Sequence, residues 1–154
     1  MKNTQQTLVL IKPDGFQRGL IGEIINRFEK RGLKLIAMNL RQVSKEFAEL
    51  HYAIHTGKPF YAGLVKYITS SPLIAMVWEG PDAIQAVRQT VGATNPLEAD
   101  PGTIRHDLSI LTSRNLIHAS DSIEAADQEI RLWFNPEEIY PWERLSEDWF
   151  TGLN

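Results

Sequence analysis

One short stretch of this chain places a side chain suited to nucleophilic chemistry beside a helix start. It reads Asn115-Leu116-Ile117-His118-Ala119-Ser120-Asp121-Ser122. A neutral imidazole is a competent nucleophile near neutral pH, because the free pKa of histidine is about 6.5. Asp121 or Ser122 can cap the following helix, whose first N–H groups favour negative charge. We therefore expect His118 to lie in the connection before that helix, placed to attack a phosphoryl group.

A phosphoryl donor needs cations around it, and this sequence offers side chains rather than a glycine loop. The chain contains neither G-x-x-x-x-G-K-[ST] nor G-x-G-x-x-G. Lys12 ends the first predicted strand, and Arg88 lies beside the apolar stripe of a predicted helix. Arg105 falls in a long loop that also holds Thr94. Such cations form charge-assisted hydrogen bonds with phosphate oxygens, although each one taken singly is more often an ordinary surface charge.

Glu129 lies eleven residues after His118, where we expect the helix to meet a last strand. A carboxylate bonded to one ring nitrogen would fix the tautomer and leave the other nitrogen ready to attack. An exposed glutamate at a helix end explains Glu129 equally well. The sequence does not separate these two interpretations.

The composition bounds the class of protein. The chain has 154 residues, 43% hydrophobic and 23% charged, which is ordinary for one globular domain over 1–154. It has no cysteine, so disulfides, zinc–thiolate sites and cysteine nucleophiles are excluded. The net charge of -3 argues against bulk binding to nucleic acid. The apolar runs are too short for a membrane span and no signal peptide is indicated, so we expect a cytoplasmic protein that needs neither nucleic acid nor a membrane.

Hydrophobic periodicity predicts a sheet covered by helices. We expect strands over 7–11, 33–40, 73–78 and 130–134, separated by helices that include one capped by Ser44. The β-α-β-β-α-β order predicts a ferredoxin-like α/β (α+β) sandwich, with a four-stranded antiparallel sheet and inserted helices. Asn135-Pro136 signals one more short helical turn. Beyond it, the tail 140–154 carries Trp142, Trp149 and Phe150, which we expect to dock on the domain or on a neighbouring subunit.

A set of short motifs spaced along the chain forms a family pattern. The string N-x-x-H-G/A-S-D is matched from Asn115 to Asp121. Other motifs follow in family order and register: Lys12-Pro13-Asp14-Gly15, Arg18-Gly19, His51-Tyr52, Pro59-Phe60, Val77-Trp78-Glu79-Gly80, Thr94-Asn95-Pro96 and Pro101-Gly102-Thr103-Ile104-Arg105. With them, the chain resembles nucleoside diphosphate kinase over almost its full length.

The resemblance implies a role for each matched position. His118 would take the γ-phosphoryl group of a nucleoside triphosphate, chiefly ATP, through Nδ1, and pass it to a nucleoside or deoxynucleoside diphosphate in a ping-pong reaction. Ser120 and Glu129 would orient the ring, and Lys12 would complete the catalytic set. The implied nucleotide-binding residues are Lys12, Tyr52, Phe60, Arg88, Thr94, Arg105 and Asn115. Because stacking on Phe60 uses a face that every base offers, we expect many bases and both sugars to be accepted.

The resemblance also implies a metal and an assembly. Mg²⁺ would sit mainly on the nucleotide phosphates and touch Asp121 through water, and the chain would form a homo-oligomer, either a hexamer or a tetramer. Three positions depart from the family pattern: His106 and Ser113 replace common glycines, and Thr112 stands at a usually apolar position near the base. These departures bear on affinity and loop geometry and do not touch the nucleophile.

Three other interpretations compete with this one. A catalytically silent nucleotide-binding module would bind without turnover. A metal site would use His51 and His55, four residues apart on one helix face, although no HExxH glutamate and no cysteine accompany them. An interaction protein would use the aromatic tail, which is compatible with an enzyme.

Overall fold

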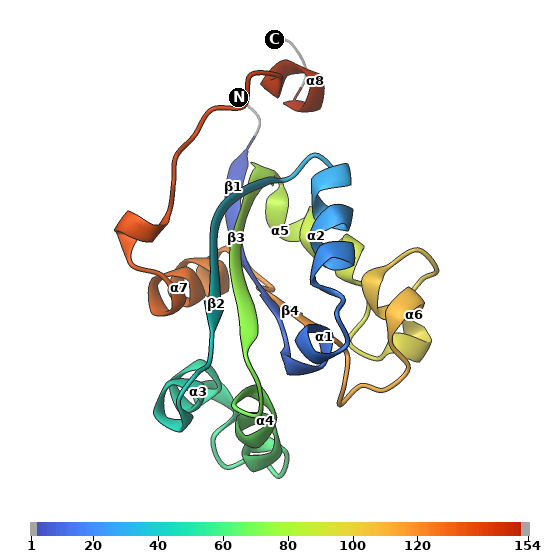
Figure 1. The fold of residues 1–154 in the computed structure, drawn as a ribbon, viewed down its shortest axis with the longest axis vertical. Coiled ribbons are helices and arrows are strands. Elements are labelled where there is room, and N and C mark those ends of the chain that lie inside the picture. Colours follow the sequence, from blue (N-terminus) through green and yellow to red (C-terminus); the bar gives the residue numbers. More distant parts are fainter. Residues whose placement is uncertain (1–2, 152–154) are drawn as a thin grey trace.

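An antiparallel sheet of four strands forms the centre of the molecule (Figure 1). The structure is a computed structural model and describes residues 3–151. The strands are β1 (Thr4–Ile11), β2 (Lys34–Arg41), β3 (Leu73–Pro81) and β4 (Ile117–Ala119). They lie in the order β2-β3-β1-β4, so that the two central strands are β3 and β1. Every pair in this sheet is antiparallel.

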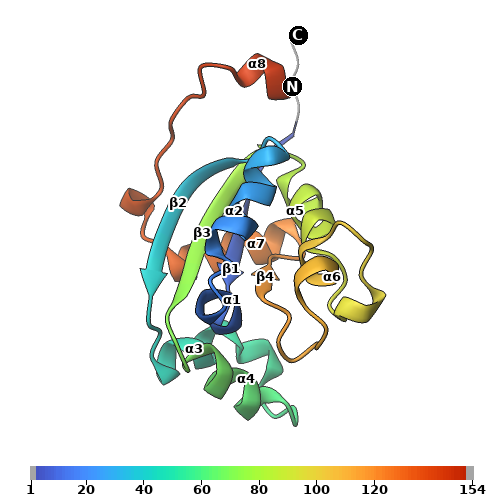
Figure 2. The same ribbon diagram turned by 45° about the vertical axis from the view of Figure 1, so that its right-hand side comes forward.

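Helices cover both faces of the sheet (Figure 2). They are α1 (Pro13–Gln17), α2 (Ile21–Lys30), α3 (Lys45–His51), α4 (Tyr61–Ile68), α5 (Ala83–Val91), α6 (Ile104–Leu108), α7 (Ile123–Trp133) and α8 (Glu147–Thr151). Three-residue 3₁₀ turns occur at Ala53–His55, Pro96–Glu98 and Pro136–Glu138. The core order β1-α2-β2-β3-α5-β4 is the ferredoxin-like arrangement, so the predicted fold class is confirmed.

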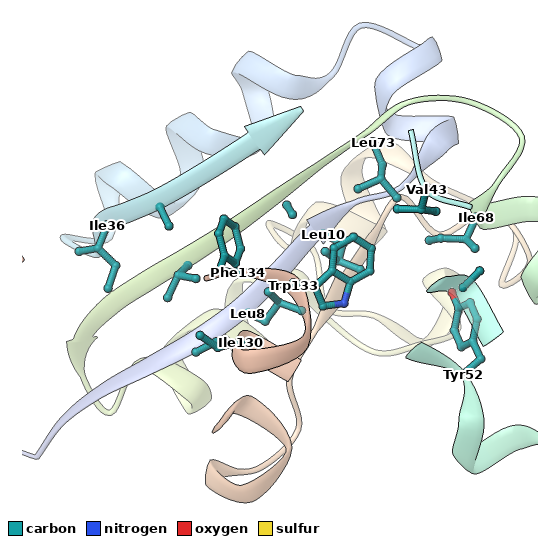
Figure 3. Packing of buried hydrophobic residues seen from close by; sticks show 14 of the residues in the cluster. Leu8, Leu10, Ile36, Val43, Tyr52, Ile68, Leu73, Ile130, Trp133 and Phe134 are labelled. Carbon is teal, nitrogen blue, oxygen red and sulfur yellow. The ribbon is translucent and has the colours of Figure 1, made fainter. Parts of the chain in front are cut away.

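Alternate residues of the central strands β1 and β3 belong to two separate hydrophobic clusters, because side chains alternate across a sheet. On one face, Leu8 and Leu10 of β1 pack with Ile130 and Trp133 of α7, together with residues of α3 and α4 (Figure 3). On the other face, β1 packs against α2, α5 and α6. Burial on both faces explains why residues 7–11 form a continuous run of fully buried positions.

The predicted fourth strand is wrong. Residues 130–134 are not a strand, because α7 continues to Trp133. Ile123, Ala126 and Ile130 keep their helical spacing through the whole segment, and Trp133 extends the buried stripe by one more turn. The true fourth strand is the three-residue β4, too short for any period to show in the sequence. His118 therefore lies within a strand, opposite Leu10, and not in a loop.

The local signals for the starts of two helices agree with the structure. Ser44 caps α3 by accepting a hydrogen bond from the Phe47 N–H, and Ser122 caps α7 by accepting from the Ala125 N–H. The turn after Asn135 is present. The tail docks on the edge strand, since Trp142 Nε1 donates to the Leu35 carbonyl at 2.8 Å. Trp149, in contrast, is 89% exposed.

Within residues 3–151, no helix combines the length and the apolar character needed to cross a bilayer.

Candidate active site

The His118 ring is held by a carboxylate and a hydroxyl behind it. Its Nε2 lies 2.8 Å from Glu129 Oε1 and 3.2 Å from Oε2. A carboxylate only accepts, so Nε2 carries the hydrogen and Nδ1 keeps its lone pair. Ser120 Oγ donates to the same Glu129 oxygen at 2.9 Å and is fully buried. Glu129 belongs to α7 rather than to a helix–strand junction, and β4 and α7 together bring these three predicted residues into one cluster.

A second histidine packs against the first. The rings of His51 and His118 meet edge to face, with their centroids 4.9 Å apart. His51 Nδ1 accepts a hydrogen bond from Trp133 Nε1 at 3.1 Å. An indole N–H is only a donor, so His51 Nδ1 must be unprotonated and the ring neutral. Burial, helped by His118 and Lys12, lowers the pKa of His51 to about 2, which agrees with this tautomer.

Lys12 emerges from the end of β1 toward the segment before β4. Its Nζ donates to Asn115 Oδ1 at 2.8 Å, and Asn115 Nδ2 donates to the Thr94 carbonyl at 2.9 Å. Burial and the nearby Arg105 lower the pKa of Lys12 to about 8. Three predicted nucleotide-binding residues from distant parts of the chain are therefore joined by hydrogen bonds.

Arg105 lies beneath the cleft and is only 9% exposed. Its guanidinium donates to three backbone carbonyls, those of Asn115, Gly92 and Ile117, at 3.3, 3.1 and 2.6 Å. Burial and the neighbouring Arg88 lower the pKa of Arg105 to about 10, so it keeps its charge at neutral pH. Arg105 thus ties together the loop ends that border the cleft and adds a positive charge below them.

These groups line one cleft of about 470 Å³. Its walls include most of the predicted site residues, namely Lys12, Tyr52, Arg88, Thr94, Arg105, Asn115, His118, Asp121 and Glu129. Ser120 lies behind the cleft rather than in its wall. Phe60 also lies outside the wall; it is 52% exposed, and its ring centroid is 5.4 Å from that of His55, which does line the cleft. A more open groove of about 690 Å³ adjoins it and shares Arg88 and Asp121 but does not include His118.

Sequence reasoning missed the place of His51. In the sequence, His51 appears in the His51-Tyr52 motif and as a candidate metal ligand with His55, yet in the structure its ring packs against that of His118. The signal lay in the His51-Tyr52 motif, but its target, 67 residues away in the chain, has no local trace. In the described part of the chain, no group of three His, Asp or Glu side chains is arranged to hold a metal ion, so the metal alternative gains no support.

The chain matches known proteins over nearly its whole length. The family model for nucleoside diphosphate kinase matches residues 5–139. Nucleoside diphosphate kinases of Archaeoglobus fulgidus and Neurospora crassa are 54% and 53% identical, over 94% and 97% of this chain and 96% and 98% of theirs.

Solved structures agree. A nucleoside diphosphate kinase of Halobacterium salinarum in complex with CDP is 47% identical with a TM-score of 0.93, covering 96% of this chain and 99% of the other. A family protein from Babesia bovis is 45% identical with a TM-score of 0.92, covering 95% and 99%. By sequence and by structure, this chain belongs to the nucleoside diphosphate kinase family, whose enzymes transfer phosphate between nucleotides.

Proposed function

We propose that this chain moves the γ-phosphoryl group of a nucleoside triphosphate, chiefly ATP, to nucleoside and deoxynucleoside diphosphates through a phosphohistidine at His118. The observation that carries the proposal is the 2.8 Å bond between His118 Nε2 and Glu129. It assigns the proton to Nε2 and leaves the Nδ1 lone pair as the nucleophile. His118 lines the cleft and its side chain is 26% exposed, so a substrate can reach the ring.

The reaction divides into two matched halves. In the first, the bond from Nδ1 to the γ-phosphorus forms while the bond from that phosphorus to the bridging oxygen breaks, and the diphosphate leaves. Nε2 keeps its proton, and the positive charge that develops on the ring is balanced by Glu129. In the second half, a different diphosphate attacks the same phosphorus, and the imidazole returns to its neutral form. One cleft therefore serves donor and acceptor in turn, which predicts ping-pong kinetics.

The charge distribution of the cleft supports a polyphosphate ligand. Lys12, Arg88 and Arg105 line it, while Asp121 and Glu129 supply the negative charges. Burial and then Arg105 lower the pKa of Lys12, and burial and then Arg88 lower the pKa of Arg105, so an incoming anion would offset both the burial and the repulsion of these cations. The Halobacterium salinarum relative in complex with CDP supports a nucleotide as that anion.

The residues present fit a Mg²⁺ ion that arrives on the nucleotide. Asp121 is an exposed carboxylate in the cleft wall, and one carboxylate plus phosphate oxygens is a usual environment for this ion. When bound, Mg²⁺ would neutralise part of the charge on the transferring phosphoryl group. Asp121 would hold it through water.

Phe60 and the assembly complete the proposal. Half of the Phe60 ring is exposed beside the cleft, so it is available for stacking on any base. We also propose a homo-oligomer, hexamer or tetramer, supported by large exposed apolar side chains such as Leu40, Leu97 and Ile110. The molar mass measured by light scattering tests the assembly. The cytoplasmic location stays a prediction.

The decisive experiment maps a covalent phosphate. The protein is incubated with ATP and Mg²⁺, quenched in alkali and digested, and the peptide that gains the mass of one phosphoryl group is sequenced. We expect the mass on His118, its loss when GDP is added, and parallel lines in a two-substrate kinetic plot. Exchange activity in a sample whose His118 never carries the phosphate would reject the mechanism.

A further inference from the structure

Leu116 adopts a backbone conformation that leucine rarely takes. Its φ is +71°, and the Ile117 N–H donates to the Asn115 carbonyl at 2.9 Å across it. A hydrogen bond from residue i+2 to residue i with positive φ at the centre is the rare, strained form of the γ-turn. Leu116 is fully buried and lies two positions before His118. Strain of this kind persists only where surrounding groups impose it.

The groups that impose it belong to α1 and its N-cap residue, Lys12. The Leu116 N–H donates to Asp14 Oδ2 at 3.0 Å, and the Lys12 N–H donates to the Leu116 carbonyl at 2.8 Å. Gly15 permits this approach, because a Cβ there would lie 2.8 Å from Ile11 Cγ2 and 3.2 Å from the Leu116 oxygen. Both backbone polar groups of Leu116, its N–H and its carbonyl, are therefore hydrogen-bonded to a segment about one hundred residues away in the chain.

Asp14 also connects the turn to α4. Its Oδ1 accepts a hydrogen bond from the Tyr67 hydroxyl. The Arg114 guanidinium lies over the same Tyr67 ring, 4.3 Å from the centroid. Burial and the Asp14 carboxylate raise the pKa of Tyr67, so the phenol stays a donor. The Asp14 carboxylate therefore joins α1, α4 and the segment that leads into β4.

The residues on either side of the turn are the ones that the proposed reaction needs. Asn115 precedes the Leu116 turn and accepts a hydrogen bond from the Lys12 ammonium, while Ile117 and His118 follow the turn in β4. We propose that Asp14 is a positioning residue, whose carboxylate fixes the Leu116 turn and thereby sets Lys12 and Asn115 relative to His118. The inference rests on the proposed function of His118 and extends the site to a side chain outside the cleft wall.

Asp14 has a second effect through its charge. Among the charged groups that face Lys12, Arg105 and Arg114 lower its pKa and Asp14 raises it, whereas the adjoining His51 is neutral. Removing the Asp14 charge while keeping its shape should therefore lower the pKa of Lys12. The alkaline limb of kcat/KM, which reports the free enzyme, would move to lower pH.

The test compares two variants at Asp14 with a matched control. Asp14→Ala removes the hydrogen-bond acceptor, and Asp14→Asn keeps an acceptor oxygen without the charge. The control, Asp127→Asn, makes the same charge change at an exposed position of α7. Each protein is assayed for exchange between ATP and dTDP, for the single-turnover rate of His118 phosphorylation, and for its thermal unfolding. We expect Asp14→Ala to lose on the order of 100-fold in the phosphorylation rate, because small displacements of reacting groups cost about that much.

Asp14→Asn should recover to within about tenfold of the parent near pH 7, because it keeps the positioning oxygen, and should show the shifted alkaline limb. Asp127→Asn should change neither. A parental rate in Asp14→Ala would overturn the proposal. An alkaline limb of kcat/KM that does not move in Asp14→Asn would also overturn it. This pH profile can be measured even if Asp14→Ala fails to fold. Absence of phosphate on His118 of the parent would reject the proposed function alone, since the exchange rates still measure the effect of Asp14.

Discussion

The two ends of the cleft are built on different principles. At the chemical end, the hydrogen bonds of His118, Glu129 and Ser120 run among side chains of a strand and a helix, and Ser120 is fully buried. At the proposed nucleotide-binding end, Arg88 and Thr94 in the wall and Phe60 beside it are exposed side chains of a helix, a loop and a helix start. The groups around His118 are thus held by one another, whereas Arg88, Thr94 and Phe60 offer exposed side chains to the proposed nucleotide. This difference suits an enzyme that performs one reaction on many bases.

The largest effect is expected when the proposed nucleophile, His118, is removed. His118→Ala should abolish exchange between ATP and other diphosphates, because it removes the Nδ1 lone pair that we propose as the nucleophile. Binding of ADP, measured by calorimetry, should survive, because the nucleotide end is intact. Turnover close to that of the parent would show that His118 is not the nucleophile.

A smaller loss should follow when the ring is kept but released from its support. Glu129→Ala frees Nε2 and Ser120 Oγ together, and we expect kcat to fall on the order of 100-fold through misplacement of Nδ1. Glu129→Gln retains an acceptor oxygen without the charge and should fall less. Single-turnover phosphorylation rates compare the two directly. If the alanine and glutamine variants were equally impaired, charge rather than orientation would be the main contribution of Glu129.

At the nucleotide end, loss of the stacking ring should affect binding alone. Phe60→Ala should raise KM by about fivefold to tenfold for every diphosphate, since stacking contributes about 1–3 kcal/mol and half of this ring is exposed. kcat should stay near the parent value. Steady-state kinetics with ADP, GDP, CDP and dTDP measure this. An increase confined to purines would indicate that Phe60 reads the base as well as stacking on it.

Local signals in the sequence were sufficient for much of the fold. Ser44 predicted the start of α3, and of the two candidates Asp121 and Ser122 it is Ser122 that caps α7, because a cap depends only on residues three positions apart. Strand β4 was not predicted, because it depends on a contact between distant parts of the chain. Its three residues exist as a strand only because Leu10 and its neighbours pair with them. A period cannot appear in so short a segment, and the pairing partner is more than one hundred positions away.

The candidate site shows the same division. Chemical need alone left Glu129 open between a group that orients the His118 ring and an exposed glutamate, and the family resemblance implied the first of these roles. The structure places Glu129 inside α7 and not at a junction of helix and strand. The link from Asp14 to Leu116 had no counterpart in the sequence reasoning, because it depends on a backbone angle and on a contact between distant segments. Side-chain type and motif spacing indicated His118, Glu129 and Ser120, whereas the contacts of His51 and Asp14 became evident only in the structure.

The smallest expected effect on catalysis comes from Trp133, and Trp142 provides a matched control for its effect on stability. Trp133 and Trp142 each donate an indole N–H. Trp133 of α7 donates to His51, and Trp142 of the tail donates to the Leu35 carbonyl of β2. Each substitution by phenylalanine should lower the free energy of unfolding by about 1 kcal/mol for the lost hydrogen bond. Trp133 is 2% exposed and Trp142 is 43% exposed, so Trp133→Phe should cost somewhat more through lost packing.

Only Trp133→Phe should also change catalysis. Without the indole donor, His51 can rotate or shift its hydrogen to Nδ1, and the edge-to-face contact with His118 loosens. We expect kcat to fall by less than about tenfold, a modest misplacement compared with loss of Glu129. Thermal unfolding and steady-state kinetics on both variants separate the effects. If Trp142→Phe slowed turnover as much as Trp133→Phe, the loss would reflect general stability, and His51 would not belong to the preorganised end of the cleft.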